Sequence, residues 1–234
     1  MIRPNRTLLV LATLATAGAL ALGACTSVGP SSSASAALPT LSLAPSPSGA
    51  AVGPHDCPTS QPAALPAGET RTVTITTTRG DIVIKVEGAL SPIAAGNFVA
   101  LAACGYYDGV DFHRVVPGFV IQGGDGQYGR EPKVDMTNIG SGGPGYTIKD
   151  EPVTATYGRG VVAMARTQAP DSQGSQFFIV TDDKARDALA SVNTYAIFGH
   201  VTSGMPVVDA ITGEADAEIP THPIVMTKVT VSTP

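Results

Sequence analysis

Apolar and polar residues alternate over short stretches of the chain from residue 73 onward. Two runs have an apolar residue at every second position: Val73 and Ile75, then Ile82, Ile84 and Val86. A period of two is typical of half-buried β-strands, because successive side chains point to opposite faces. Arg79-Gly80 lies between the two runs and favours a tight turn. The pattern therefore predicts a β-hairpin.

Helical spacing follows this hairpin. Ser91 can cap a helix with Pro92 at its first position, and Gly105 can end it. Apolar residues recur between these ends at helical spacing: Ala94, Phe98, Leu101 and Ala102. A second short helix is predicted to begin near Pro206 and to carry Val207, Val208 and Ile211.

Further short apolar runs, separated by Gly- and Pro-rich turns, fill most of the remaining chain. They lie at 110–122, 161–165, 176–180, 196–201 and 224–231. Many short strands with two helices predict a mainly β fold, a closed barrel capped at its ends.

The N-terminal third has a different composition. Residues 26–54 contain no charged residue and are dominated by Ser, Ala, Pro and Gly. Such a segment buries too little apolar surface to offset the entropy of ordering it. Because this composition persists to about Gly68, we predict a disordered tether over 25–68 and a folded domain over 69–234.

The first 24 residues resemble a bacterial lipoprotein signal peptide. Arg3 and Arg6 precede an apolar stretch, which ends at Leu22-Gly23-Ala24-Cys25. In that reading Cys25 is lipidated and becomes the first mature residue. The protein is then exported and held by its lipid on the outer face of the cell membrane or on the periplasmic side. A cleaved secretory signal with an incidental Cys25 is the alternative, and a retained anchor fits less well because the apolar run is short.

The charge of the chain bears on nucleic-acid binding, and its cysteines bear on a possible disulfide. The formal net charge is −5, and removing the first 24 residues leaves 12 basic residues against 19 acidic ones. That balance repels a polyanion and argues against nucleic-acid binding. Cys57 and Cys104 then remain as a pair in an oxidising compartment, which permits a disulfide. Cys104 could equally be a buried free thiol in the last turn of a helix.

Three blocks of sequence carry the chemistry. Residues 112–125 read Phe-His-Arg-Val-Val-Pro-Gly-Phe-Val-Ile-Gln-Gly-Gly-Asp, 174–179 read Gly-Ser-Gln-Phe-Phe-Ile, and 197–201 read Ile-Phe-Gly-His-Val. Together they closely resemble the cyclophilins, a family of peptidyl-prolyl cis/trans isomerases, and the resemblance covers 72–232. It implies an eight-stranded antiparallel β-barrel capped by two α-helices, with no metal or other cofactor. We expect its partners to be proline-containing peptides and unfolded exported proteins. We expect the protein to be a monomer.

The resemblance also assigns roles to residues. Arg114 matches the catalytic arginine, and a fixed cation suits the task because the prolyl nitrogen of a twisted amide can accept a hydrogen bond. Phe119 and Phe178 are expected to wall an apolar proline pocket. Alternation then leaves Phe177, like Phe112, in the core. The residues expected to position the substrate are Gln122, Gln176, Gly140 and the backbone at Ala165 and Arg166.

The chain departs from the family pattern at four places. Val120 stands where the family has Met, and Tyr195 stands where it usually has His. The chain has no Trp, so Leu189 is the nearest apolar candidate for that substrate-binding position. Residues 126–139 form a longer loop, which we interpret as a solvated excursion rather than a partner-binding insertion.

Two other functions remain open at this point. The first is a proline-peptide binding or chaperone module with weak or no turnover, and the second is a scaffold lipoprotein that retains the activity incidentally. A pure binder has no need of a donor to the prolyl nitrogen, so Arg114 favours the enzyme. His55, His113, His200 and His222 are scattered without ligand spacing, which argues against a metalloenzyme.

Overall fold

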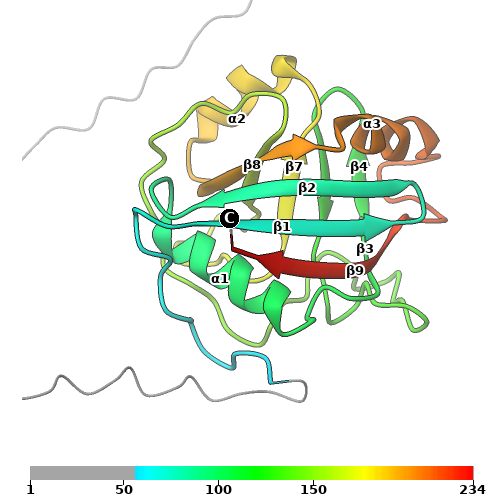
Figure 1. The fold of residues 1–234 in the computed structure, drawn as a ribbon. Helices are drawn as coiled ribbons and strands as arrows, with labels where there is room; N and C mark the ends of the chain where they lie inside the picture. The colour runs from blue at the N-terminus through cyan, green and yellow to red at the C-terminus, as the bar shows by residue number, and fades with distance from the viewer. Residues whose placement is uncertain (1–55, 234) are drawn as a thin grey trace, which may run out of the picture. The chain divides into compact units, whose positions relative to one another are not determined.

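Nine strands form one antiparallel sheet, with three α-helices around it (Figure 1). The structure is a computed structural model that describes residues 56–233. The strands are β1 (Thr70–Thr77), β2 (Gly80–Glu87), β3 (Val110–Asp111), β4 (Arg114–Val116), β5 (Val120–Gly123), β6 (Val161–Met164), β7 (Phe177–Val180), β8 (Ile197–Ser203) and β9 (Val225–Ser232). The helices are α1 (Pro92–Ala103), α2 (Arg186–Val192) and α3 (Met205–Glu214), with a 3-10 turn, η1 (Asp183–Ala185), before α2.

The sheet curls strongly, because its two edges belong to one stretch of chain. The strand order is β3-β9-β1-β2-β8-β6-β7-β5-β4, and only Phe112 and His113 separate β3 from β4 in sequence. These two residues interrupt the ladder, so the edges are joined by the chain itself. The mainly β prediction is confirmed. The closed eight-stranded barrel with two helices was wrong in detail, since nine strands form a half-barrel with three helices.

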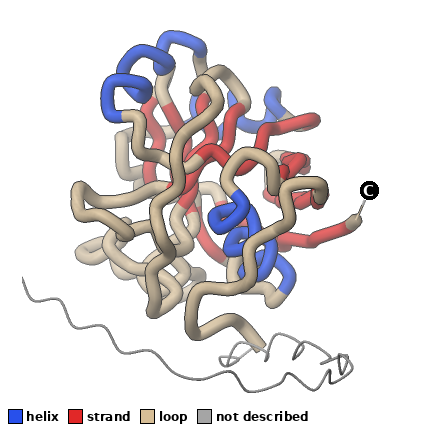
Figure 2. Tube along the Cα trace, turned by 90° about the vertical axis from the view of Figure 1, so that its left-hand side faces the viewer, coloured by secondary structure: helices blue, strands red, loops and turns tan. Residues whose placement is uncertain are grey.

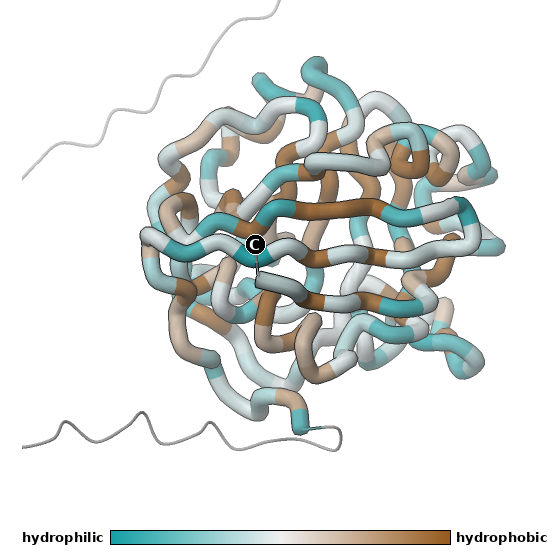
Figure 3. Tube along the Cα trace, viewed as in Figure 1, coloured by the Kyte–Doolittle hydropathy of each residue, from teal (hydrophilic) through white to brown (hydrophobic). Residues whose placement is uncertain are grey.

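The predicted hairpin forms the centre of the sheet. β1 and β2 pair in a register that places Val73 opposite Ile84 and Ile75 opposite Ile82. All four side chains are fully buried, and the middle of β2 shows as a hydrophobic stretch in Figure 3. Because opposite residues of an antiparallel pair share a face, this register sends one apolar row into the core.

The helices lie outside the sheet, and loops cover the side that faces the viewer in Figure 2. α1 begins where the sequence predicts, with Ser91 at the N-cap position and Pro92 in its first turn, but the Ser91 side chain makes no capping hydrogen bond. Gly105, just past the helix, adopts a positive φ of 78°, a conformation that favours glycine. Phe98 and Leu101 from α1 are fully buried in the main core.

α2 is the helix that the sequence pattern missed. Its seven residues follow η1 directly. The turn is capped by Asp182, whose side chain accepts a hydrogen bond from the Lys184 backbone N–H, and the helix ends at Asn193 in a left-handed conformation. Both end signals are visible in the sequence. One buried residue, Leu189, is too little to produce a periodic pattern.

The predicted boundary between tether and domain was placed too late. Leu65 is buried, and its backbone N–H donates to the Pro92 carbonyl at 2.9 Å. Cys57 forms a disulfide with Cys104 at the end of α1. Residues 56–68 therefore pack on the domain, because an apolar anchor and a covalent link hold them there. The predicted signal peptide, Cys25 and the predicted tether up to residue 55 lie outside the described residues.

None of the helices within 56–233 has the length and apolar character that a membrane crossing requires.

Candidate active site

A row of four residues crosses one face of the sheet. Arg114 in β4 is paired with Gln122 in β5, which is paired with Phe178 in β7, and Phe178 is paired with Ala163 in β6. Opposite residues in antiparallel strands project to the same face. The pairing register alone therefore brings a cation, an amide and an aromatic ring together.

This face has an apolar cluster of its own. Alternation sends Phe177 and Ile179 into the main core, whereas Phe178 and Val180 join a second cluster with Val120. The predicted split between Phe177 and Phe178 is thus confirmed. The second cluster gives the exposed face of the sheet a firm apolar floor.

A cavity of about 250 Å³ lies over this floor. Its lining consists of nine of the eleven predicted catalytic and substrate-binding residues: Arg114, Phe119, Val120, Gln122, Ala165, Arg166, Phe178, Leu189 and Tyr195. Arg114 supplies charge to a space whose other walls are largely aromatic and aliphatic. Such a cavity suits a compact apolar ring with a polar atom near the cation.

A chain of hydrogen bonds runs from Arg114 through two glutamines to a glycine-rich loop. Arg114 Nη1 lies 3.5 Å from Gln122 Oε1, and Gln122 Nε2 donates to Gln176 Oε1 at 2.9 Å. Gln176 Nε2 in turn donates to the carbonyls of Gly140 and Gly142 at 2.9 and 2.8 Å. The two glutamines are therefore oriented by their neighbours before any peptide binds.

Gly140 and Gln176 line an adjoining cavity of about 660 Å³, which shares Gln122, Ala165 and Arg166 with the first. Its glycine wall is held from beneath by Asp125, which is fully buried. Asp125 Oδ2 accepts hydrogen bonds from the backbone N–H groups of Gly140 and Gly142 at 2.7 and 3.0 Å.

A Cβ on Gly142 would lie 2.2 Å from an oxygen of Asp125, so only glycine fits there. Asp125 was not among the predicted site residues. It is the last residue of the first sequence block, where it follows two glycines. That position was the one sequence signal that could have marked it as a site residue.

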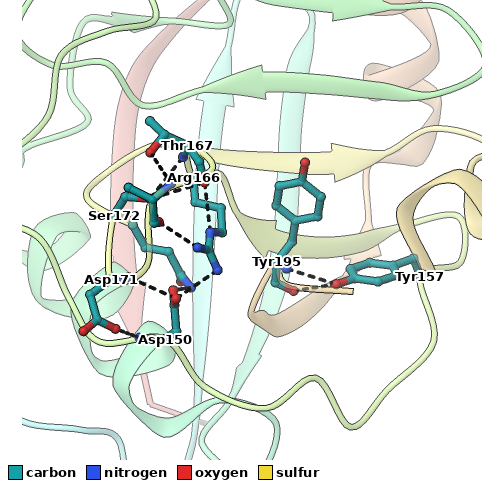
Figure 4. Close-up of polar contacts among 9 residues, drawn as sticks. Asp150, Tyr157, Arg166, Thr167, Asp171, Ser172 and Tyr195 are labelled. Carbon is teal, nitrogen blue, oxygen red and sulfur yellow. Dashed lines mark hydrogen bonds and ion pairs between the residues drawn. The ribbon is translucent and has the colours of Figure 1, made fainter. Parts of the chain in front are cut away.

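The loop after β6 supplies the wall between the two cavities. Arg166 Nη1 pairs with Asp150 at 2.9 Å, while its other nitrogens donate to the carbonyls of Thr167 and Ala169. Figure 4 shows the guanidinium turned back onto its own loop. The side chain is only 8% exposed, so Arg166 stiffens the wall, and the expected pairing of its backbone with a peptide stays a prediction.

Tyr195 is another lining residue of the first cavity. Its ring meets Phe178 edge-on at 5.3 Å between centroids. The Tyr157 hydroxyl donates to the Tyr195 carbonyl at 2.9 Å and accepts from its N–H at 3.2 Å (Figure 4). Burial raises the pKa of Tyr157 to about 12, so this hydroxyl keeps its proton and the clamp persists at any ordinary pH.

The protein-family model that describes the cyclophilin-type peptidyl-prolyl cis-trans isomerases matches residues 72–231. The chain belongs to the cyclophilin family. Its activity is therefore that of a peptidyl-prolyl cis-trans isomerase.

Known cyclophilins match the chain at moderate identity. Peptidyl-prolyl cis-trans isomerase B of Escherichia coli (strain K12) is 37% identical over 171 residues, covering 68% of this chain and 99% of the relative. A probable peptidyl-prolyl cis-trans isomerase of Brucella abortus (strain 2308) is 38% identical over 141 residues, covering 59% of this chain and 70% of the relative.

A cyclophilin-type isomerase of Cryptosporidium parvum has the same fold, with a TM-score of 0.59 and 29% identity. The match covers 70% of this chain and 99% of that one. A second crystal structure of that protein, determined in the presence of the dipeptide Ala-Pro, has a TM-score of 0.58.

Two buried titratable residues of this cyclophilin, Asp111 and His113, lie just before β4, the strand that carries Arg114. His113 is 3% exposed, and burial lowers the pKa of its imidazole. Asp111 is fully buried, and burial together with the nearby Glu131 carboxylate raises its pKa to about 7. Neither lines the two cavities. Within residues 56–233, no cluster of three or more His, Cys, Asp or Glu could hold a metal ion.

Proposed function

We propose that this cyclophilin accelerates X–Pro bond rotation in exported proteins, with Arg114 donating a hydrogen bond to the prolyl nitrogen of the twisted amide. The observation that carries the proposal is that Arg114 lines the first cavity together with Phe119 and Phe178. The cation and the apolar walls lie where one proline ring can meet both.

The chemistry requires no bond to be made or broken. Resonance gives the amide a rotational barrier of about 18–20 kcal/mol, and uncatalysed X–Pro exchange takes roughly tens to hundreds of seconds. Twisting returns a lone pair to the nitrogen, which only then accepts a hydrogen bond. A donor placed there stabilises the transition state more than either planar form, which is the condition for faster turnover.

The substrates we propose are proline-containing peptide segments of unfolded proteins. The Cryptosporidium parvum relative was crystallised in the presence of the dipeptide Ala-Pro, which supports a proline-containing peptide as the ligand class. Gln122 and Gln176, oriented by their hydrogen bonds, offer amide groups suited to a peptide backbone.

Arg114→Ala is the direct test. We expect kcat/KM on an Ala-Pro peptide to fall by roughly 10- to 150-fold, because hydrogen bonds to charged groups contribute about 1.5–3 kcal/mol. Peptide affinity, measured by NMR titration, should fall much less. An equal loss of affinity and turnover would make Arg114 a binding residue instead.

We further propose that the protein is exported and anchored through a lipid on Cys25. Two observations support export: the lipobox-like Leu22-Gly23-Ala24-Cys25, and the disulfide between Cys57 and Cys104, since disulfides persist in oxidising compartments. Residues 26–55 would then serve as a tether between the membrane and the isomerase domain.

Cys25→Ser should release the protein from membranes of a bacterial host into the soluble fraction. Stable attachment generally takes more than one lipid signal, so the proposal assumes a multiply acylated cysteine. Fractionation with quantitative blotting gives the readout. A serine variant that stays with the membrane would show that another segment or a bound partner holds it.

A further inference from the structure

A loop from the far end of the chain reaches the proposed catalytic arginine. Residues 215–224 connect α3 to β9, and Glu218 lies within them. Its Oε1 accepts a hydrogen bond from Arg114 Nε at 2.7 Å, and its backbone carbonyl accepts from the Val115 N–H at 2.8 Å. One residue thus holds two successive residues of β4 from outside the sheet.

The loop that carries Glu218 is itself braced. The Asp216 carboxylate accepts hydrogen bonds from the backbone N–H of Thr221, at 3.0 Å, and from its hydroxyl. That hydroxyl also lies 3.0 Å from His222 Nδ1. Glu218 lies inside the bracket between Asp216 and Thr221, so its backbone is held before its side chain engages Arg114.

The contact with Glu218 uses the Nε side of the guanidinium and leaves Nη1 to face the first cavity. Glu218 binds Nε, whereas Nη1 lies towards Gln122 in the wall of the first cavity. The guanidinium is planar with donors in fixed directions, so anchoring Nε fixes where the remaining N–H groups point. An arginine without this anchor would sample several side-chain rotamers.

We propose that Glu218 is a positioning residue for catalysis, which orients Arg114 towards the prolyl nitrogen. This inference rests on the role proposed above for Arg114. It does not make Glu218 a stability element: the Glu218 side chain is 61% exposed, and exposed ion pairs stabilise folded proteins little. Loss of the Glu218 side chain should therefore lower turnover and leave the stability of the fold nearly unchanged.

Glu218→Ala should lower kcat/KM on an Ala-Pro peptide by about three- to tenfold, with little change in melting temperature. Glu218→Gln keeps an oxygen that can accept from Nε and should stay within about twofold of wild type. Glu214→Ala is the matched control. Glu214 pairs with Arg79 through a similar exposed contact of 2.8 Å, and neither residue lines either cavity. That variant should turn over like wild type.

A double-mutant cycle separates positioning from an unrelated structural effect. In an Arg114→Ala background, Glu218→Ala should cost no further activity, because there is no guanidinium left to orient. An additional loss in that background would overturn the inference, as would unchanged or higher turnover of the single variant. Equal impairment of Glu218→Gln and Glu218→Ala would also overturn it. If Arg114→Ala itself retains full turnover, the proposed role of Arg114 fails instead.

Discussion

Asp111 is a buried carboxyl group without a hydrogen-bond donor among the described residues. Its pKa is raised to about 7 from an ordinary value of 3.8, chiefly by burial and secondarily by Glu131. The folded protein therefore holds a proton that the unfolded chain releases. The contribution to stability is complete below pH 3.8 and is lost as the pH rises through about 7.

We therefore predict that Asp111→Asn becomes progressively more stable than wild type as the pH rises. The difference in melting temperature should widen from about pH 5 to about pH 8, since the wild-type carboxyl must ionise without a partner while the amide stays neutral. His113 acts in the opposite direction because burial lowers its pKa, so each variant is compared with wild type at the same pH.

Asp183→Asn is the control for this series. The Arg159 backbone N–H lowers the pKa of Asp183, which is exposed, so both forms keep the same relative stability across that range. A constant gap between Asp111→Asn and wild type would show that Asp111 ionises freely in the folded protein.

Five of the nine residues that line the first cavity could be named from the sequence because two of its blocks contain them: Arg114, Phe119, Val120, Gln122 and Phe178. The other four came from the family resemblance along the rest of the domain. Glu218 could not be named, since 104 residues separate it from Arg114 and nothing local marks its role. Asp125 was quoted within a block, but its role depends on the approach of Gly140 and Gly142. Contacts between distant segments follow from the fold and cannot be read from spacing.

At the level of elements, α1 obtains its N-terminal cap from a distant residue. The Ser91 hydroxyl, the predicted cap, is buried without a hydrogen-bond partner among the described residues. The carboxylate of Glu151 instead accepts from the backbone N–H groups of Ile93 and Ala94, each at 2.8 Å. A negative charge at that end also suits the helix dipole.

Glu151→Ala is accordingly predicted to cost about 0.5–2 kcal/mol of folding free energy, the usual range for a lost cap. Urea unfolding of both variants gives the comparison, with Ser91→Ala as the control that should cost little. A larger loss from Ser91→Ala than from Glu151→Ala would mean that the serine caps the helix in solution.

Elements with strong periodicity were predictable, and those defined by tertiary contacts were not. The alternation in β1 and β2 predicted a hairpin that the structure contains. The apolar run at 110–122 contains parts of three strands, because Phe112 and His113 separate β3 from β4 and a turn at 117–119 separates β4 from β5. An apolar run indicates which residues are buried, but it does not indicate which of their backbone groups form the hydrogen bonds of the sheet.

At the scale of the whole molecule, the disulfide fastens the N-terminal segment to the domain. Cys57 and Cys104 are 47 residues apart, and closing a loop of that length restricts the unfolded chain. Replacing both cysteines with serine should lower the unfolding free energy by about 2–4 kcal/mol. Neither cysteine lines a cavity, so kcat/KM below the melting transition should match wild type. A loss of turnover in the intact fold would reveal a link between this segment and the site.

The strand order also has a consequence for how the chain is made. β9, the last strand, lies between β1 and β3, two of the first. The sheet cannot be completed until residues 225–232 have left the ribosome, and pairings this distant in sequence form slowly. Until then β1 and β3 each lack the strand that lies between them. For a chain exported by the route proposed above, that delay favours an unfolded, threadable polypeptide until the final strand arrives, and leaves folding to the far side of the membrane.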